Sequence, residues 1–373
     1  MIVIFAGVVL NHLQRFLKVF RFDEVDRVPD YEFCYWKETI TRWHKEGLPR
    51  YVEDRNEMNA YLGLEGWPPG EQLPIRNGLW PTLPSRTIKI EGDRATIDDG
   101  MGGICYQTIS TSSLPHYLRH PLKDKEDWEK LQSFFDPDTP GRFPLNWDEI
   151  AETYRDREYP LGIRVGSLYG WLRNWMGVKR ISICFYQDPD WICEMMDTLV
   201  NLWIKLIRKA LGTVKVDYSQ WWEDMCYSRG PLLSVNHFEE YMVPRYRKVT
   251  NVLKEYGVEL NLLDSDGDIT ALVPGWLEAG INVMYPLEAR FTDMYRLRED
   301  FGHNVLLIGN YDKRVLFHGV DLSSMQKEFG RLTPMLEDGG YIPMIDHCVP
   351  PEVSFRTFKA YLEKKRAWLR QAS

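Results

Sequence analysis

The sequence contains few of the short motifs that mark common enzyme classes. It has no GxGxxG, Walker A, GxSxG or HExxH pattern, and its six cysteines include no CxxC pair. These absences give no support to nucleotide binding, to a serine hydrolase or to a cysteine-rich zinc site. The scattered cysteines also predict no disulfide framework, so we expect a reducing, cytoplasmic environment.

Basic residues and long apolar runs are also scarce. Lys and Arg number 46 against 54 Asp and Glu, which gives a formal net charge of -8. This balance argues against nucleic acid and against anionic membrane surfaces as partners. The apolar residues 1–10 are too short to span a bilayer and lack the basic region of a secretory signal. We expect them to begin a core strand or helix, unless the start codon is wrongly assigned.

The chain is long enough to bury a large core, because 44% of its 373 residues are hydrophobic. Strand-like and helical segments alternate at least five times, which favours an α/β fold with a parallel sheet. A (β/α)8 TIM barrel would use residues 1–373 as a single domain. The predicted strands are 163–168, 213–216, 258–263, 281–284, 304–308 and 341–345, and the main predicted helices are 190–211, 238–256 and 323–336.

Two segments depart from this alternation. The residues before it form an N-terminal extension. Within them, the residues 87–90 and 95–97, separated by Glu-Gly-Asp, predict a β-hairpin. We interpret the hairpin as an insertion that could cover the mouth of the barrel.

Three carboxylates follow the predicted strand 258–263. Residues two apart on a strand point to the same side, so Asp264 and Asp266 can face one ion or one substrate, whereas Asp268 is placed to cap the following helix. Metal binding, acid–base catalysis and turn formation all use aspartate. An EF-hand is excluded because Gly275 stands where the twelfth-position glutamate is required.

Other polar residues follow neighbouring strands, and parallel strands bring their carboxyl ends to one mouth. His347 is the histidine that we select, because a histidine beside carboxylates suits zinc or another divalent metal. Glu223 and Glu288 follow bulky residues and would serve either proton transfer or pairing with an arginine. We expect Cys348 to be a buried small residue rather than a ligand.

Aromatic residues also fall near the predicted strand ends. Tyr169, Trp171, Trp222 and Tyr311 are candidates to line a pocket for a flat substrate. Core packing is the more common role of such residues, and both interpretations stay open.

Several stretches of the sequence are distinctive: Arg27-Val28-Pro29, LLDSDGDI at 262–269, PLE at 286–288 and GGYIPMIDHCVPPEVS at 339–354. They resemble the uroporphyrinogen decarboxylase superfamily and, more narrowly, its methyltransferase-like branch. The resemblance covers essentially the whole chain and implies a (β/α)8 barrel. The Arg-Gln-Ala-Gly-Arg motif, with which true decarboxylases hold substrate carboxylates, is absent, which argues against porphyrinogen decarboxylation.

The resemblance also implies a chemistry. Corrinoid-linked methyltransferases of the superfamily bind zinc through His-x-Cys-Gly, where this chain has Asp264-Ser265-Asp266-Gly267, and through a later cysteine, where it has His347. The lost thiolates put thiol methylation in doubt and favour a small methoxylated aromatic donor. We expect zinc or another divalent metal on Asp264, Asp266, Glu288 and His347, and catalytic roles for Glu223, Asp266 and His347.

The cobalamin is expected on a separate corrinoid protein, because the chain has no Asp-x-His-x-x-Gly motif; a homodimer is a further possibility. Two alternatives stay open. One is a metal-free decarboxylase or lyase that acts on another carboxylate substrate, with Asp266 and His347 as its acid and base. The other is a non-catalytic barrel that serves as a binding subunit.

Overall fold

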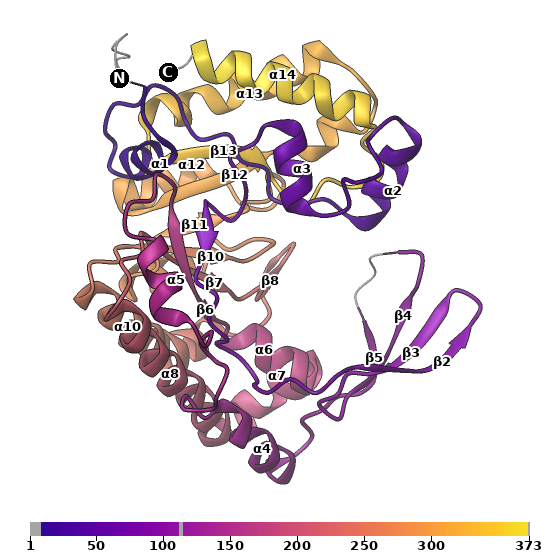
Figure 1. Cartoon of the computed structure of the whole chain (residues 1–373), viewed down its shortest axis with the longest axis vertical. Coiled ribbons are helices and arrows are strands. Elements are labelled where there is room, and N and C mark those ends of the chain that lie inside the picture. Colours follow the sequence, from indigo (N-terminus) through magenta and orange to yellow (C-terminus); the bar gives the residue numbers. More distant parts are fainter. Residues whose placement is uncertain (1–8, 112–114, 372–373) are drawn as a thin grey trace.

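The fold is built on a curled, seven-stranded parallel sheet (Figure 1). The structure is a computed structural model that describes residues 9–111 and 115–371. In spatial order the strands are β1 (Glu71–Gln72), β6 (Leu161–Gly166), β7 (Tyr218–Trp222), β10 (Leu260–Asp264), β11 (Val283–Tyr285), β12 (Leu306–Tyr311) and β13 (Tyr341–Ile345). The α/β class and the parallel sheet predicted from the alternation are therefore confirmed.

The predicted closure into eight strands is not observed in the described part of the chain. One edge strand, β1, has only two residues and is flanked by Pro69 and Pro74, which cannot donate hydrogen bonds to a neighbouring strand. At the other edge, a single parallel bridge joins Tyr35 to Val349, just beyond β13. The described sheet is therefore an open half-barrel rather than a closed barrel.

Helices alternate with the strands and cover the outer face of the sheet. The described helices are α1 (His12–Phe20), α2 (Lys37–Lys45), α3 (Arg55–Leu62), α4 (Lys125–Gln132), α5 (Trp147–Thr153), α6 (Tyr169–Met176), α7 (Val178–Gln187), α8 (Pro189–Leu211), α9 (Val235–His237), α10 (Val243–Glu255), α11 (Val273–Glu278), α12 (Met294–Phe301), α13 (Leu322–Asp338) and α14 (Phe355–Gln371). Asp188 caps α8 by accepting a hydrogen bond from the Trp191 amide, as predicted. Asp268 instead accepts from the Thr270 amide and does not cap α11, so its predicted role was wrong.

Strand β7 begins five residues later than the predicted start at Thr213. Its alternation sorts two adjacent tryptophans to opposite faces. Trp221 packs outward against Trp203 of α8 and Tyr246 of α10, with ring centroids 6.0 and 5.6 Å away. Trp222 pairs in register with Asp264 and therefore lies on the inner face.

The predicted hairpin is part of a larger insertion, an antiparallel sheet of four strands. They are β2 (Arg86–Glu91), β3 (Arg94–Asp98), β4 (Ile104–Thr108) and β5 (His116–Arg119). In Figure 1 this sheet stands off from the body of the protein and does not lie over the half-barrel. A smaller hairpin pairs β8 (Cys226–Tyr227) with β9 (Gly230–Pro231).

The N-terminal extension is fastened to the last strand and helix by a buried ion network. Lys365 of α14 is fully buried, and its Nζ lies 2.8 Å from Glu32 and 3.1 Å from Asp30. Glu32 also accepts hydrogen bonds from the Ile345 amide of β13 and the Tyr361 hydroxyl of α14. This network fixes the segment that follows Glu32 beside the carboxyl end of β13.

In the described part of the chain, no helix is both long and apolar enough to cross a membrane. Most of the apolar start, residues 1–8, lies outside the described residues.

Candidate functional site

Asp266 and His347 meet at the carboxyl ends of β10 and β13. His347 Nε2 and Asp266 Oδ2 are 3.1 Å apart, and about a quarter and a third of the two side chains remain exposed, respectively. Burial by itself lowers the pKa of His347, but the hydrogen bond and the charge of Asp266 outweigh this effect and raise it above its ordinary value. The pair is therefore an imidazole whose protonated form is favoured by the carboxylate beside it, and both side chains are partly exposed.

Two further aspartates lie on the Asp266 side of the mouth. Burial raises the pKa of Asp264 well above its usual range, and the negative charges of Asp266 and Asp224 raise it further. Burial also raises the pKa of Asp224, although Arg173 Nη2 lies 3.1 Å from its carboxylate. Closely spaced carboxylates cannot all ionise easily, so burial and the neighbouring negative charges favour the neutral acid at Asp264.

Sequence reasoning did not select Asp224. Its backbone has a φ of +44°, which the local sequence does not predict. It also follows the end of β7, which lies later in the chain than the predicted strand 213–216.

Glu223 is placed differently from the catalytic role expected of it. Its side chain is fully buried, and its carboxylate accepts hydrogen bonds from the amides of Leu168 and Tyr169, at 2.8 Å each, and from the hydroxyl of Ser167 at 2.9 Å. Burial raises its pKa, while these hydrogen bonds oppose the rise. These hydrogen bonds join the end of β7 to the start of α6. A direct role of Glu223 in proton transfer stays a prediction.

The four predicted metal ligands do not form a metal site by themselves. Glu288 accepts hydrogen bonds from the Gly267 amide at 2.9 Å and from Lys313 Nζ at 3.3 Å, so a lysine already neutralises it. Asp266 Oδ1 is buried without a hydrogen-bond partner, which a cation or a substrate donor would satisfy. No group of three or more His, Cys, Asp or Glu side chains in the described residues is arranged to hold a metal ion.

Aromatic rings surround His347. Phe33 and Trp36 of the N-terminal segment have ring centroids 5.9 and 6.5 Å from the imidazole. Phe33 also contacts Trp67, and both contact Tyr285 of β11, with ring centroids 4.9–6.2 Å apart. We call Phe33, Trp36, Trp67 and Tyr285 the aromatic collar. Sequence reasoning missed it because the N-terminal residues are about 310 positions from His347.

The four aromatics predicted to line a pocket are divided among different surroundings. Tyr169 is fully buried, and burial raises the pKa of its hydroxyl to about 12. Trp171 packs on Trp203, with ring centroids 5.6 Å apart, and Trp222 is half-buried on the inner face. Tyr311 is fully buried against Phe329 and Tyr361 of the outer helices. Of the four, Trp222 is therefore the best placed to meet a substrate.

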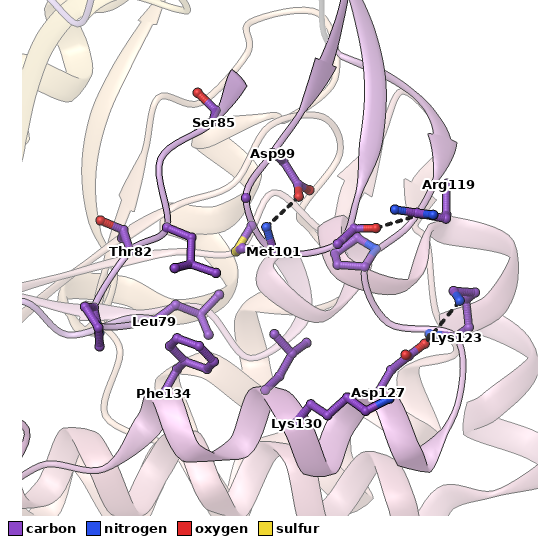
Figure 2. A pocket seen from close by; sticks show the side chains of 16 residues that line it. Leu79, Thr82, Ser85, Asp99, Met101, Arg119, Lys123, Asp127, Lys130 and Phe134 are labelled. Atoms are coloured by element: carbon purple, nitrogen blue, oxygen red, sulfur yellow. Dashed lines mark hydrogen bonds and ion pairs between the residues drawn. The ribbon is translucent and has the colours of Figure 1, made fainter. Parts of the chain in front are cut away.

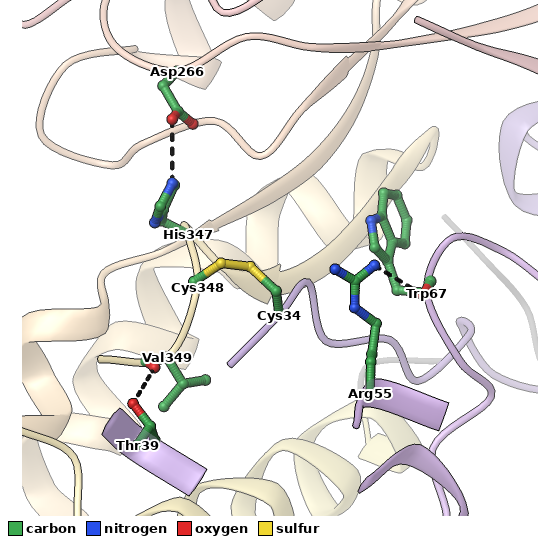
Figure 3. Close-up of a disulfide and its surroundings, with 8 residues drawn as sticks. All are labelled: Cys34, Thr39, Arg55, Trp67, Asp266, His347, Cys348 and Val349. Carbon is green, nitrogen blue, oxygen red and sulfur yellow. Dashed lines mark hydrogen bonds and ion pairs between the residues drawn. A yellow bond between two sulfur atoms is a disulfide. The ribbon is translucent and has the colours of Figure 1, made fainter. Parts of the chain in front are cut away.

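The structure corrects the prediction that Cys348 is simply a buried small residue. It is half-buried and forms a disulfide with Cys34, which was not predicted, across 314 residues of sequence. Figure 3 shows this disulfide directly below the Asp266–His347 pair, with Arg55 and Trp67 beside it. Backbone hydrogen bonds on both sides, from Val349 N to Cys34 O and from Trp36 N to Val349 O, hold the two segments together.

A curled parallel sheet that brings acidic and imidazole groups to the carboxyl ends of its strands is the arrangement of barrel-type α/β enzymes. The family model of uroporphyrinogen decarboxylase (URO-D) matches residues 95–368, which is most of the chain. The chain therefore belongs to this family, as the resemblance predicted.

One similar solved structure is that of a methyltransferase from Methanosarcina mazei. Its TM-score is 0.62 at 14% sequence identity, and the alignment covers 96% of this chain and 99% of that chain. At this identity the likeness shows a shared fold. No curated protein gives a significant match to the sequence.

Proposed function

We propose that this protein is a methyltransferase that moves a methyl group from a small methoxylated aromatic donor to the cobalamin of a separate corrinoid protein. The observation that carries the proposal is the partly exposed Asp266–His347 pair, which lies beside Phe33 and Trp36 of the aromatic collar. The fold shared with a methyltransferase supports it. So does the absence from this chain of a cobalamin-binding motif.

The chain's own residues would stabilise the departing oxygen. When a methyl group leaves an aryl ether, the C–O bond breaks and its electron pair stays on the oxygen. The raised pKa of His347 favours the protonated imidazole, which would donate its proton to that oxygen, and Asp266 would hold the ring in place. The collar offers flat apolar surfaces that would orient the donor's ring and exclude water from the charge that develops.

Two cofactors enter the proposal. When bound, the corrinoid protein's cobalamin supplies the nucleophile that takes the methyl group. The described side chains do not by themselves fit a three-ligand metal centre, so no step above uses zinc or another metal. Elemental analysis of the purified protein beside Asp266→Ala and His347→Ala tests the metal: bound zinc that both variants lose would restore it to the mechanism.

The test of the proposal is methyl transfer itself. Reduced free cobalamin would replace the corrinoid protein, and methylcobalamin formation from a panel of methoxylated benzenes would be followed by its visible spectrum. We expect His347→Gln to lower the rate by about 10²–10⁴-fold, the usual contribution of a general acid. The control His303→Gln, an exposed histidine in the turn between α12 and β12, should keep the rate. Equal rates in both variants would contradict the role of His347.

A decarboxylase is the second candidate, because an acid–base pair without a three-ligand metal group also suits protonation of the carbanion left by loss of CO2. Release of CO2 from carboxylated analogues, without methylcobalamin formation from any methoxylated donor, would select it.

A further inference from the structure

A cavity of about 670 Å³ lies where the four-stranded sheet joins the body of the protein, away from the Asp266–His347 pair (Figure 2). Its walls come from residues 79–85, the turn 99–102 between β3 and β4, residues 119–123 at and after the end of β5, and the helical segment 127–134. None of these residues belongs to the Asp266–His347 site or to the aromatic collar. The volume falls within the range of small-molecule binding sites.

Much of the cavity wall is apolar. Leu79, Met101 and Phe134 lie around the same space in Figure 2, and Leu131 forms part of the wall. Leu83 also lines the cavity and is 53% exposed. The sheet stands off from the body, so its own packing does not close this space. Apolar surface left accessible beside convergent polar groups is typical of a binding site.

Of the three cations that line the cavity, only Arg119 is without an ion pair among the described residues, so an anion would bind there. Lys130 Nζ lies 2.8 Å from Glu126, and two carboxylates, Asp99 and Asp127, also form part of the wall. Asp99 Oδ1 accepts hydrogen bonds from the amides of Met101 and Gly103 at 2.8 Å, whereas its Oδ2 is buried without a hydrogen-bond partner. Asp127 accepts the Lys123 amide at 3.1 Å, and its Oδ2 lies 3.6 Å from Lys123 Nζ.

Arg119 is the group best placed to hold the anion. Its Nε donates to the Gly102 carbonyl at 2.8 Å, which fixes the guanidinium at the cavity wall. In the part of the chain that the structure describes, no carboxylate forms an ion pair with Arg119. A guanidinium with its terminal nitrogens available binds a carboxylate through two parallel hydrogen bonds.

We propose that this cavity binds a small amphipathic carboxylate, with its apolar part against Leu79, Met101 and Phe134 and its carboxylate on Arg119. Such a ligand would touch the sheet and the segment 127–134 at once, and would hold the sheet against the body. A ligand without an apolar part, such as inorganic phosphate, would gain nothing from most of the wall.

Calorimetric titration of the full chain with 2-naphthoate tests the proposal. We expect saturable binding, about tenfold weaker for Arg119→Gln because one charge-assisted pair is lost, and abolished for Met101→Trp, which fills the space. The matched control is Arg94→Gln on the same sheet, whose guanidinium lies over Tyr106 and outside the cavity; it should bind as the wild type does. The neutral analogue 2-naphthalenemethanol should bind more weakly than the carboxylate.

Several results would overturn the proposal. They are no saturable binding, equal affinities of Arg119→Gln and Arg94→Gln, or competition by inorganic phosphate as strong as that by a second amphipathic carboxylate. Binding that is lost in Trp36→Ala but kept in Arg119→Gln would place the probe in the aromatic collar and would also overturn it. None of these outcomes depends on methyl transfer, so failure of this proposal and failure of the proposed function can be told apart.

Discussion

Replacing Glu223 by glutamine should destabilise the protein without removing its chemistry. Both carboxylate oxygens accept hydrogen bonds in a fully buried position, two of them from amides at the start of α6. A glutamine keeps one acceptor oxygen, but its NH2 group would face an amide donor. An unpaired buried N–H costs about 1–3 kcal/mol, and the lost charge at the helix N-terminus adds about 0.3–1 kcal/mol. We therefore expect Glu223→Gln to lower the free energy of unfolding by about 1–4 kcal/mol.

Urea unfolding followed by circular dichroism measures this loss. The matched control is Glu239→Gln, an exposed residue between α9 and α10, which should change stability by less than about 0.5 kcal/mol. The second measurement is methylcobalamin formation per folded molecule, which should stay near the wild-type rate. A Glu223→Gln variant of normal stability that has lost turnover would refute this reasoning and support the catalytic role predicted from the sequence.

Two further predictions concern the site and its support. The His347 pKa is raised above 6.5 in the folded protein, so the stability contributed by its protonated form is complete below pH 6.5 and disappears as pH rises through the folded pKa. The stability difference between wild type and His347→Gln, measured by urea unfolding across pH, should fall with rising pH; a difference that grows would contradict this. Lys365→Met should cost about 3–5 kcal/mol, because it leaves Glu32 buried without its cation. The neighbouring Lys364→Met should cost less than about 0.5 kcal/mol, and equal losses would argue against the ion network.

Local signals in the sequence determined the fold class and part of the site. Alternating strand and helix patterns predicted a parallel sheet, since parallel strands need crossover helices. The two-residue period of a strand predicted that Asp264 and Asp266 face one side, although β10 ends at Asp264, and the meeting of strand ends at one mouth selected His347. The Asp188-Pro189 pair predicted the start of α8. Each of these features depends on residues close together in the chain.

The tertiary structure decided what depends on distant residues. Residues 213–216, three of which are β-branched, resemble a strand, yet β7 forms at Tyr218–Trp222, where hydrogen bonds to β6 and β10 hold it. Because β7 ends at Trp222, Glu223 lies where the Leu168 and Tyr169 amides donate to it, and Asp224 lies near enough to Asp266 to feel its charge.

The same reason explains the surroundings of His347. The segment that holds Phe33, Cys34 and Trp36 reaches the imidazole only because the buried Lys365–Glu32 pair and the bridge to Val349 bring it there. No local pattern encodes contacts between residues more than 300 positions apart, so the collar and the disulfide could be found only in the folded chain.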